Sequence, residues 1–235
     1  MCGIVAHVGA GAAVPRLVEA LGLLEYRGYD SVGVAIATPG GRNVTVRSTA
    51  RVAGLTAALA AALAQEPGIG VGGSGIGHTR WATHGAVDQV NAHPLGDCTG
   101  RISVAHNGVV ENAEALRITL EAEGHVFAGD VDSEVIAHLV EDSLREQSSL
   151  HTALETAVAS LVGSWAIVVL DAVSGNVAAA VHRSPLVLGR SDDGAFVASD
   201  VNAISSWVQE FRTVEDGDSV EVTALGDHWH RHGIS

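Results

Sequence analysis

Residues 165–198 read WAIVVLDAVSGNVAAAVHRSPLVLGRSDDGAFVA, and this stretch decides the fold class. Short apolar runs separated by Gly, Asn, Asp and Ser predict strands at Trp165–Leu170, Val177–Val181, Leu186–Leu188 and Ala195–Ala198. Strands that follow one another without helices between them favour antiparallel sheets over a doubly wound parallel sheet. The sequence therefore predicts an α+β fold, with a further strand at Ser219–Val222 and a brief helix at Asn202–Trp207.

The first half of the chain alternates between strand and helix periodicity. We expect a buried strand at Cys2–Val8, a helix over residues 14–24, a hairpin with strands at 32–36 and 44–46, and a helix at Arg51–Gln65. Asn112 and Asp132 precede apolar periodic runs and are candidate N-caps. The glycine-rich stretch Gly68–Gly77 is expected to be a flexible loop inside one domain spanning residues 1–235.

Composition narrows the class of protein. With 47% hydrophobic and 17% charged residues the chain is too apolar to be disordered. All 13 positive charges are arginines and the formal net charge is −14, which disfavours nucleic acid and anionic membranes as partners. The sequence has no apolar run of membrane-spanning length, no export signal after Met1, and two cysteines that make no disulfide framework, so we expect a cytoplasmic protein.

Cys2 is the first candidate for chemistry. Removal of Met1 would leave a thiol and a free α-amino group on the same residue. Such an amine has a pKa of roughly 7.7 to 8.0, which suits it to take a proton from the thiol and return it to a leaving group. The alternative is that Cys2 is a small apolar residue opening a buried strand.

A dense polar cluster follows at residues 77–85, which read GHTRWATHG. Arg80 could bind a carboxylate through two hydrogen bonds, Thr83 and His84 could add further bonds, and Trp81 could cover a pocket. The alternative is a strand end with a structural ion pair. The spacing of His78 and His84 matches no zinc signature, so no metal or other cofactor is predicted.

Two further positions have a structural and a functional interpretation. Asn107 and Gly108 follow an apolar run, where Asn-Gly is a strong turn signal but also supplies the two donors of an oxyanion site. Asp132 could cap the helix that follows it or bind an ammonium group. Neither choice is settled by these residues alone.

Together these clusters resemble the class II glutamine amidotransferases, the N-terminal-nucleophile branch that opens with Cys-Gly-Ile. Within it the chain is most similar to the glutaminase domains of the glutamine:fructose-6-phosphate aminotransferases. The motifs that carry this resemblance, which runs to about residue 225, are CGIV at residue 2, LEYRGYDS at 24, HTRWATHG at 78, NAHP at 91, HNG at 106 and DSEVIAHL at 132.

The resemblance implies a four-layer α/β/β/α sandwich of two antiparallel sheets and hydrolysis of L-glutamine through a thioester. Cys2 would be the nucleophile, and Asn107 with the Gly108 N–H would form the oxyanion hole. The implied glutamine-binding residues are Arg80, Trp81, Thr83, His84 and Asp132, with His93 and Arg27 nearby. The ammonia would aminate fructose-6-phosphate on an isomerase half that this chain lacks, and through which a homodimer could form.

Other interpretations stay open. The chain could be a stand-alone glutaminase feeding a separate acceptor protein, a catalytically silent glutamine-binding module, or a zinc hydrolase using His78, His84 and His93. It departs from the family pattern at residues 163–166, GSWA for GAYG, and at Leu95, where a histidine usually follows NAHP. His228, His230 and His232 are expected on a solvated terminal strand, although such a trio could bind a metal, and Cys98 is assigned no role.

Overall fold

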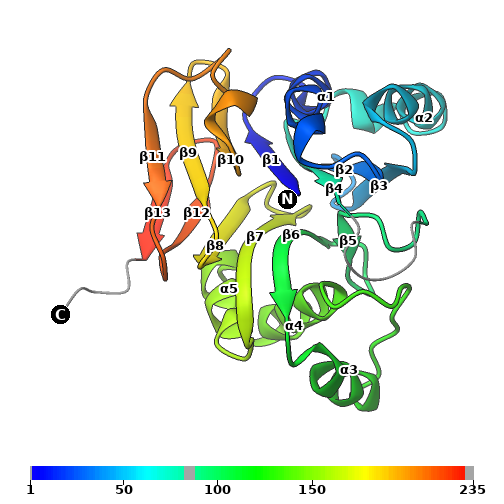
Figure 1. Cartoon of the computed structure of the whole chain (residues 1–235), viewed down its shortest axis with the longest axis vertical. Coiled ribbons are helices and arrows are strands. Elements are labelled where there is room, and N and C mark those ends of the chain that lie inside the picture. The colour runs from blue at the N-terminus through cyan, green and yellow to red at the C-terminus, as the bar shows by residue number, and fades with distance from the viewer. Residues whose placement is uncertain (1, 82–87, 231–235) are drawn as a thin grey trace.

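The computed structural model describes residues 2–81 and 88–230, whose strands form two antiparallel sheets (Figure 1). The seven-stranded sheet of this described part has the order β11 (Phe211–Val214), β9 (Leu186–Ser191), β10 (Gly194–Ala198), β1 (Gly3–Val8), β4 (Ser74–Arg80), β2 (Ser31–Ala37) and β3 (Asn43–Ser48). The six-stranded sheet has the order β13 (Asp227–His230), β12 (Ser219–Val222), β8 (Val177–His182), β7 (Gly163–Asp171), β6 (Ile102–Val110) and β5 (Leu95–Gly96).

Helices cover the outer face of each sheet (Figure 1). The helices α1 (Ala13–Leu24) and α2 (Val52–Gln65) pack on the seven-stranded sheet. The helices α3 (Ala113–Ala122), α4 (Glu134–Glu146) and α5 (Leu150–Val158) pack on the six-stranded sheet. The resulting order of layers is α/β/β/α, which confirms the predicted fold class.

Aliphatic side chains fill the space between the sheets, and many of them are alanines. The inner core contains alanines from both sheets, among them Ala6, Ala35, Ala105, Ala166 and Ala179, all nearly inaccessible to solvent. Because alanine adds only one carbon beyond the backbone, the sheets can approach closely enough for polar side chains at their ends to touch. Figure 1 shows the start of β1 at the centre of the molecule, beside β6.

The strands predicted from apolar runs are confirmed within a few residues, including the hairpin of β2 and β3. The helix predicted at Asn202–Trp207 is wrong in extent, because only the 3-10 turn η3 (Val201–Ala203) forms there. The terminal strand expected at His228 and His230 is confirmed as β13, whereas the strand β11 was not predicted. Phe211–Val214 lies at a sheet edge with three of its four residues exposed, so it lacks the apolar alternation that reveals a strand.

The flexible loop predicted at Gly68–Gly77 is also wrong. Residues 67–70 form the 3-10 turn η2 (Pro67–Gly70), and Ser74 begins β4, which lies beside β1 in the sheet. The glycines of β4 are needed for close packing, since a Cβ on Gly75 would lie 2.8 Å from Leu17 Cδ1 and 2.7 Å from Ile36 Cδ1. Glycine at this position of β4 lets α1 pack closely against the sheet, and it is not the sign of a loop.

The predicted N-caps do not form capping hydrogen bonds. Asn112 occupies the N-cap position of α3, but its side chain accepts from Val162 N–H at 2.9 Å and donates to Ser160 O at 2.8 Å. Asp132 precedes the N-cap of α4, which is Ser133. Among the described residues, no helix has the length and apolarity to cross a membrane.

Substituting Gly75 by alanine is expected to lower the free energy of unfolding by about 1–3 kcal/mol, because the new methyl group would overlap Leu17, Ile36 and the Ala35 carbonyl. Urea denaturation measures this change. Gly22→Ala is the matched control: nothing lies within 4 Å of its Cβ position in α1, so we expect a gain of about 0.5–1 kcal/mol. Equal effects of the two substitutions would contradict this account of β4.

Candidate active site

Cys2 lies at the beginning of β1, where side chains complete the backbone hydrogen bonding. Gly3 N–H donates to Thr79 Oγ1 at 3.1 Å, and Ile4 N–H donates to Ser199 Oγ at 3.0 Å. The Cys2 Sγ accepts a hydrogen bond from the backbone N–H of Trp81 at 3.2 Å. The thiol is therefore held at the end of the central strands and remains partly accessible.

Asn107 of β6 connects the two sheets beside this thiol. Its Nδ2 donates to the Cys2 carbonyl oxygen at 3.0 Å, and its Oδ1 lies 3.0 Å from His78 Nε2. That nitrogen also lies 3.2 Å from the His106 carbonyl oxygen, which can only accept, so we assign the proton of His78 to Nε2. The His78 N–H therefore donates to Asn107 Oδ1, and the NH₂ group of Asn107 faces the Cys2 carbonyl.

Gly108 adopts a conformation that favours glycine. Its φ is +138°, and a Cβ there would lie 1.9 Å from the Ser164 carbonyl oxygen. Asn107 and Gly108 both lie inside β6, paired with Ala166 and Trp165 of β7, so the turn interpretation of Asn-Gly is wrong. The missing side chain lets β7 pair closely with β6 at this point, and Gly108 lines the space beside Cys2.

Two cavities meet at Cys2, Trp81 and Gly108. The larger, of about 280 Å³, is also lined by Arg27, Asn107, Val109, Ser184, Pro185 and Ser199. The smaller, of about 50 Å³, is also lined by Arg80, His93, His106, Val131, Asp132 and Ser133. The described residues of the predicted site therefore all line one cavity or the other, while Thr83 and His84 lie outside the described residues.

Opposite charges lie in the smaller cavity. Arg80 ends β4 with only 5% of its surface exposed. The Asp132 carboxylate accepts from Val110 N–H of β6 at 2.8 Å and from Oγ of Ser133, the N-cap residue of α4, at 3.1 Å. A guanidinium and a carboxylate on the walls of one small cavity suit a zwitterionic ligand.

Buried histidines surround this cavity. Desolvation lowers the pKa of His78 to about 3, lowers that of His93 well below its ordinary range, and lowers that of His106. The rings of His78 and His93 have centroids 4.4 Å apart, and His106 Nδ1 lies 2.7 Å from Ser133 Oγ. These imidazoles are neutral near pH 7, and His78, which donates through Nε2, is a poor general base.

Burial raises the pKa of the Cys2 thiol. Few thiolates exist near neutral pH in that case, and the nucleophile needs a nearby base. Arg27 is fixed by its hydrogen bond to Ser199 O at 2.7 Å, while Trp81 is 44% exposed and packs edge-on against Tyr29 at 5.3 Å. The indole at the cavity mouth has the exposure that a covering residue requires.

Sequence reasoning missed three supporting residues. His78 orients Asn107, Thr79 and Ser199 hold the start of β1, and none of them was assigned a role in the predicted site. The alternation of a strand gives a partial signal, because His78 and Arg80 are two residues apart and so share one face of β4, while Thr79 faces the other way. Ser199 has no such signal, since it reaches Ile4 across 195 positions.

Comparison with known proteins places the chain in a family. A family profile described as "Glutamine amidotransferase domain" matches residues 78–206. The chain is 44% identical over 226 residues to the glutamine–fructose-6-phosphate aminotransferase (isomerizing) of Thermus thermophilus and 46% identical over 221 residues to that of Acidithiobacillus ferridurans. These matches cover 96% and 93% of this chain but 36% and 35% of the relatives, so the chain spans about a third of their length.

Solved structures share the fold. The glutamine phosphoribosylpyrophosphate amidotransferase of B. subtilis superposes with a TM-score of 0.80 at 24% identity, over 100% of this chain and 50% of that one. A glutamine aminotransferase class-II domain protein from Silicibacter pomeroyi has a TM-score of 0.62 at 20% identity, over 99% of this chain and 100% of its own. At these low sequence identities the similarity shows that the structures share a fold.

The low pKa of His78 predicts a pH dependence of stability. Between about pH 3 and pH 6.5 the unfolded chain binds a proton at His78 that the folded chain excludes, so stability rises with pH through that window and is complete above it. From pH 7 to pH 5 we expect His78 alone to cost about 2 kcal/mol. His78→Gln, which keeps a donor but does not titrate, should lose that part of the slope in urea denaturation; an unchanged slope would contradict the assignment.

Proposed function

Because the chain belongs to the glutamine amidotransferase domain family, we propose that it hydrolyses L-glutamine to glutamate and ammonia through a thioester on Cys2. One observation carries this proposal. The Asn107 side chain donates to the Cys2 carbonyl, and Cys2 and Gly108 line one cavity together with Arg80 and Asp132. A nucleophile, oxyanion donors and two opposite charges thus surround the space that one small amino acid would occupy.

The charges would select the substrate. Arg80 would bind the α-carboxylate of glutamine and Asp132 its α-ammonium, which aligns the side-chain amide with Cys2 Sγ. Glutamine carries no net charge, so local pairing decides its binding and the acidic net charge of the protein has little influence. Trp81 at the cavity mouth would limit access of water while the thioester exists.

The donors would stabilise the tetrahedral intermediate. The Asn107 NH₂ group uses one hydrogen on the Cys2 carbonyl and has a second to offer, beside the backbone N–H of Gly108. Attack of the sulfur on the amide carbon places negative charge on the carbonyl oxygen, and two such donors would stabilise it. Collapse of the intermediate would expel ammonia, and water would then release glutamate.

The proton carrier would be the α-amino group of Cys2 after removal of Met1. The thiol has a raised pKa and therefore needs a base, while burial makes His78 and His93 unsuited to that task. An α-amine with a pKa of roughly 8 can accept the thiol proton and deliver it to the leaving amide nitrogen. The general base would then belong to the same residue as the nucleophilic thiol, Cys2.

The destination of the ammonia is a further part of the proposal. The relatives at 42–46% identity are named for the amination of fructose-6-phosphate, and most of their length is not matched by this chain. We assign the acceptor step to that unmatched part, or to a separate protein with the same role. Neither Cys2 nor Cys98 forms a disulfide, as suits the reducing cytoplasm in which we expect the reaction to occur.

An electrophilic glutamine analogue tests the nucleophile. Intact mass and N-terminal peptide mapping should show loss of Met1 and one adduct on Cys2, blocked by excess L-glutamine, and Cys2→Ala should lose both adduct and turnover. Cys98 is the internal control, because it lies outside both cavities and should stay unlabelled. Retained Met1, or equal labelling of the two thiols, would instead favour the silent glutamine-binding module.

The two halves of the site should separate in the kinetics of glutamine hydrolysis. Asn107→Ala is expected to lower kcat by about 10²–10³, because it removes a donor that acts in the transition state. Arg80→Ala is expected mainly to raise KM, and Arg80→Lys, which keeps the charge without the planar fork, should recover part of the loss. Urea denaturation checks that each variant is folded. Unchanged kinetics in a folded variant would refute the role of that residue.

A further inference from the structure

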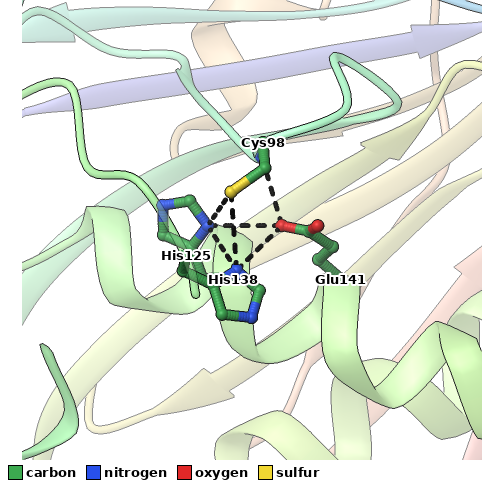
Figure 2. A group of neighbouring side chains, drawn as sticks. All are labelled: Cys98, His125, His138 and Glu141. Carbon is green, nitrogen blue, oxygen red and sulfur yellow. Dashed lines mark hydrogen bonds and ion pairs between the residues drawn. The ribbon is translucent and has the colours of Figure 1, made fainter. Parts of the chain in front are cut away.

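Four side chains that commonly bind metals meet on the outer side of the six-stranded sheet, away from the glutamine cavities. Cys98 follows β5, His125 follows α3, and His138 and Glu141 lie one turn apart on α4 (Figure 2). One ligand atom from each residue lies within 4.8 Å of all the others. Both histidines and Glu141 are buried, while Cys98 is accessible to solvent.

Five of the six distances between these atoms match the edges of a ligand tetrahedron around one ion, and the sixth, from Cys98 Sγ to a Glu141 carboxylate oxygen, is at most 4.8 Å. Cys98 Sγ lies 3.5 Å from both His125 Nδ1 and His138 Nδ1, and the two nitrogens are 3.2 Å apart. Glu141 Oε2 lies 3.1 Å from the first nitrogen and 3.3 Å from the second. A tetrahedral zinc ion with ordinary bond lengths separates two nitrogen ligands by about 3.4 Å and a nitrogen from a sulfur by about 3.6 Å.

Hydrogen bonds alone explain this arrangement poorly. An imidazole nitrogen has either one hydrogen or one lone pair, yet His125 Nδ1 has Cys98 Sγ, His138 Nδ1 and Glu141 Oε2 within 3.5 Å. Figure 2 shows both rings turned so that Nδ1 faces the sulfur and the carboxylate. Such convergence is expected when the four atoms share a central partner.

The outer atoms of the cluster are also arranged as in a metal site. The other ring nitrogen of His125 lies 2.9 Å from Asp142 Oδ1, and that of His138 lies 3.8 Å from Glu134 Oε1. Neither pair is aligned as a hydrogen bond, but a nearby carboxylate favours the proton on the outer nitrogen through its charge, which leaves the lone pair of Nδ1 for a metal. Cys98 Sγ accepts the Val126 N–H at 3.4 Å, which fixes the position of the sulfur.

We propose that Cys98, His125, His138 and Glu141 bind one Zn²⁺ ion in a closed, structural site. One sulfur, two nitrogens and one oxygen are a zinc ligand set, and the thiolate disfavours Mg²⁺ and Ca²⁺, which prefer oxygen ligands. On binding, the Cys98 thiol releases its proton to solvent, and the thiolate and the Glu141 carboxylate balance the charge of the ion. This site is independent of the proposed glutaminase chemistry.

The ion would fix two loops that also reach the glutamine cavity. The loop that carries His93 continues through the short edge strand β5 to Cys98, and the loop from His125 continues to Asp132. The loops touch near their cavity ends, where Asp130 N–H donates to Asn91 Oδ1 at 3.1 Å. Zinc would clamp their far ends to α4 and thereby reduce the freedom of the residues at the cavity.

Metal content is the direct test. The chain, expressed without a polyhistidine tag in zinc-containing medium, should carry about one zinc ion per chain, as measured by inductively coupled plasma mass spectrometry. Cys98→Ser should weaken zinc binding at least about 100-fold, and Asp142→Asn about 10–100-fold. Cys2→Ser, which removes the other thiol, and the double variant His228→Gln/His230→Gln, which alters the terminal strand, should keep the zinc.

Cobalt gives a readout that depends on the ligands. Co²⁺ added to the metal-free chain should produce the strong visible bands of tetrahedral cobalt and a sulfur-to-cobalt charge-transfer band, and the latter should vanish in Cys98→Ser. Because Cys98 is at the surface, its serine variant should fold, which circular dichroism checks. Absence of zinc from the purified chain together with no binding of added Zn²⁺, or equal zinc content in Cys98→Ser, would overturn the proposal. None of these readouts uses glutamine.

Discussion

The hydrogen bonds of Asn107 are the interaction on which the rest of the site depends. This one amide joins the Cys2 carbonyl, just before β1, to the imidazole of His78 on β4, and it comes from the opposite sheet. The reach of an asparagine is short, so the two sheets must approach closely at this end. The alanine-rich inner core allows that approach. The geometry at the Cys2 thiol therefore depends on how closely the two sheets pack.

Burial determines the electrostatics of the same region. His78, His93 and His106 are kept neutral by desolvation, so the formal charges that line the smaller cavity are Arg80 and Asp132. In a medium of low dielectric constant these charges act more strongly on a bound ligand than they would in water. The same burial lowers the free energy of unfolding as the pH falls, because the histidines can take up protons in the unfolded chain but not in the folded one.

The loops at the cavity are held at both ends by polar contacts. Arg47 of β3 donates to the Pro94 carbonyl next to His93, and the Glu134 carboxylate accepts from the backbone N–H groups of Ala128 and Gly129 near Asp132. The cluster of Cys98, His125, His138 and Glu141 lies at the far end of both loops. Rigid support of this kind is what a site needs when its ligand is small and its donors must not move.

The sequence by itself determined the α+β class, most of the strands and the residues around Cys2, because apolar periodicity and short motifs are local properties. It failed where an element is defined by its neighbours: the glycines of β4 looked like a loop, Asn107-Gly108 looked like a turn, and Asp132 looked like a cap. Only the tertiary structure decided that Ser199 supports β1 and that Cys98 meets His125 and His138. Contacts between residues distant in the chain depend on how helices and sheets pack, which no local pattern encodes.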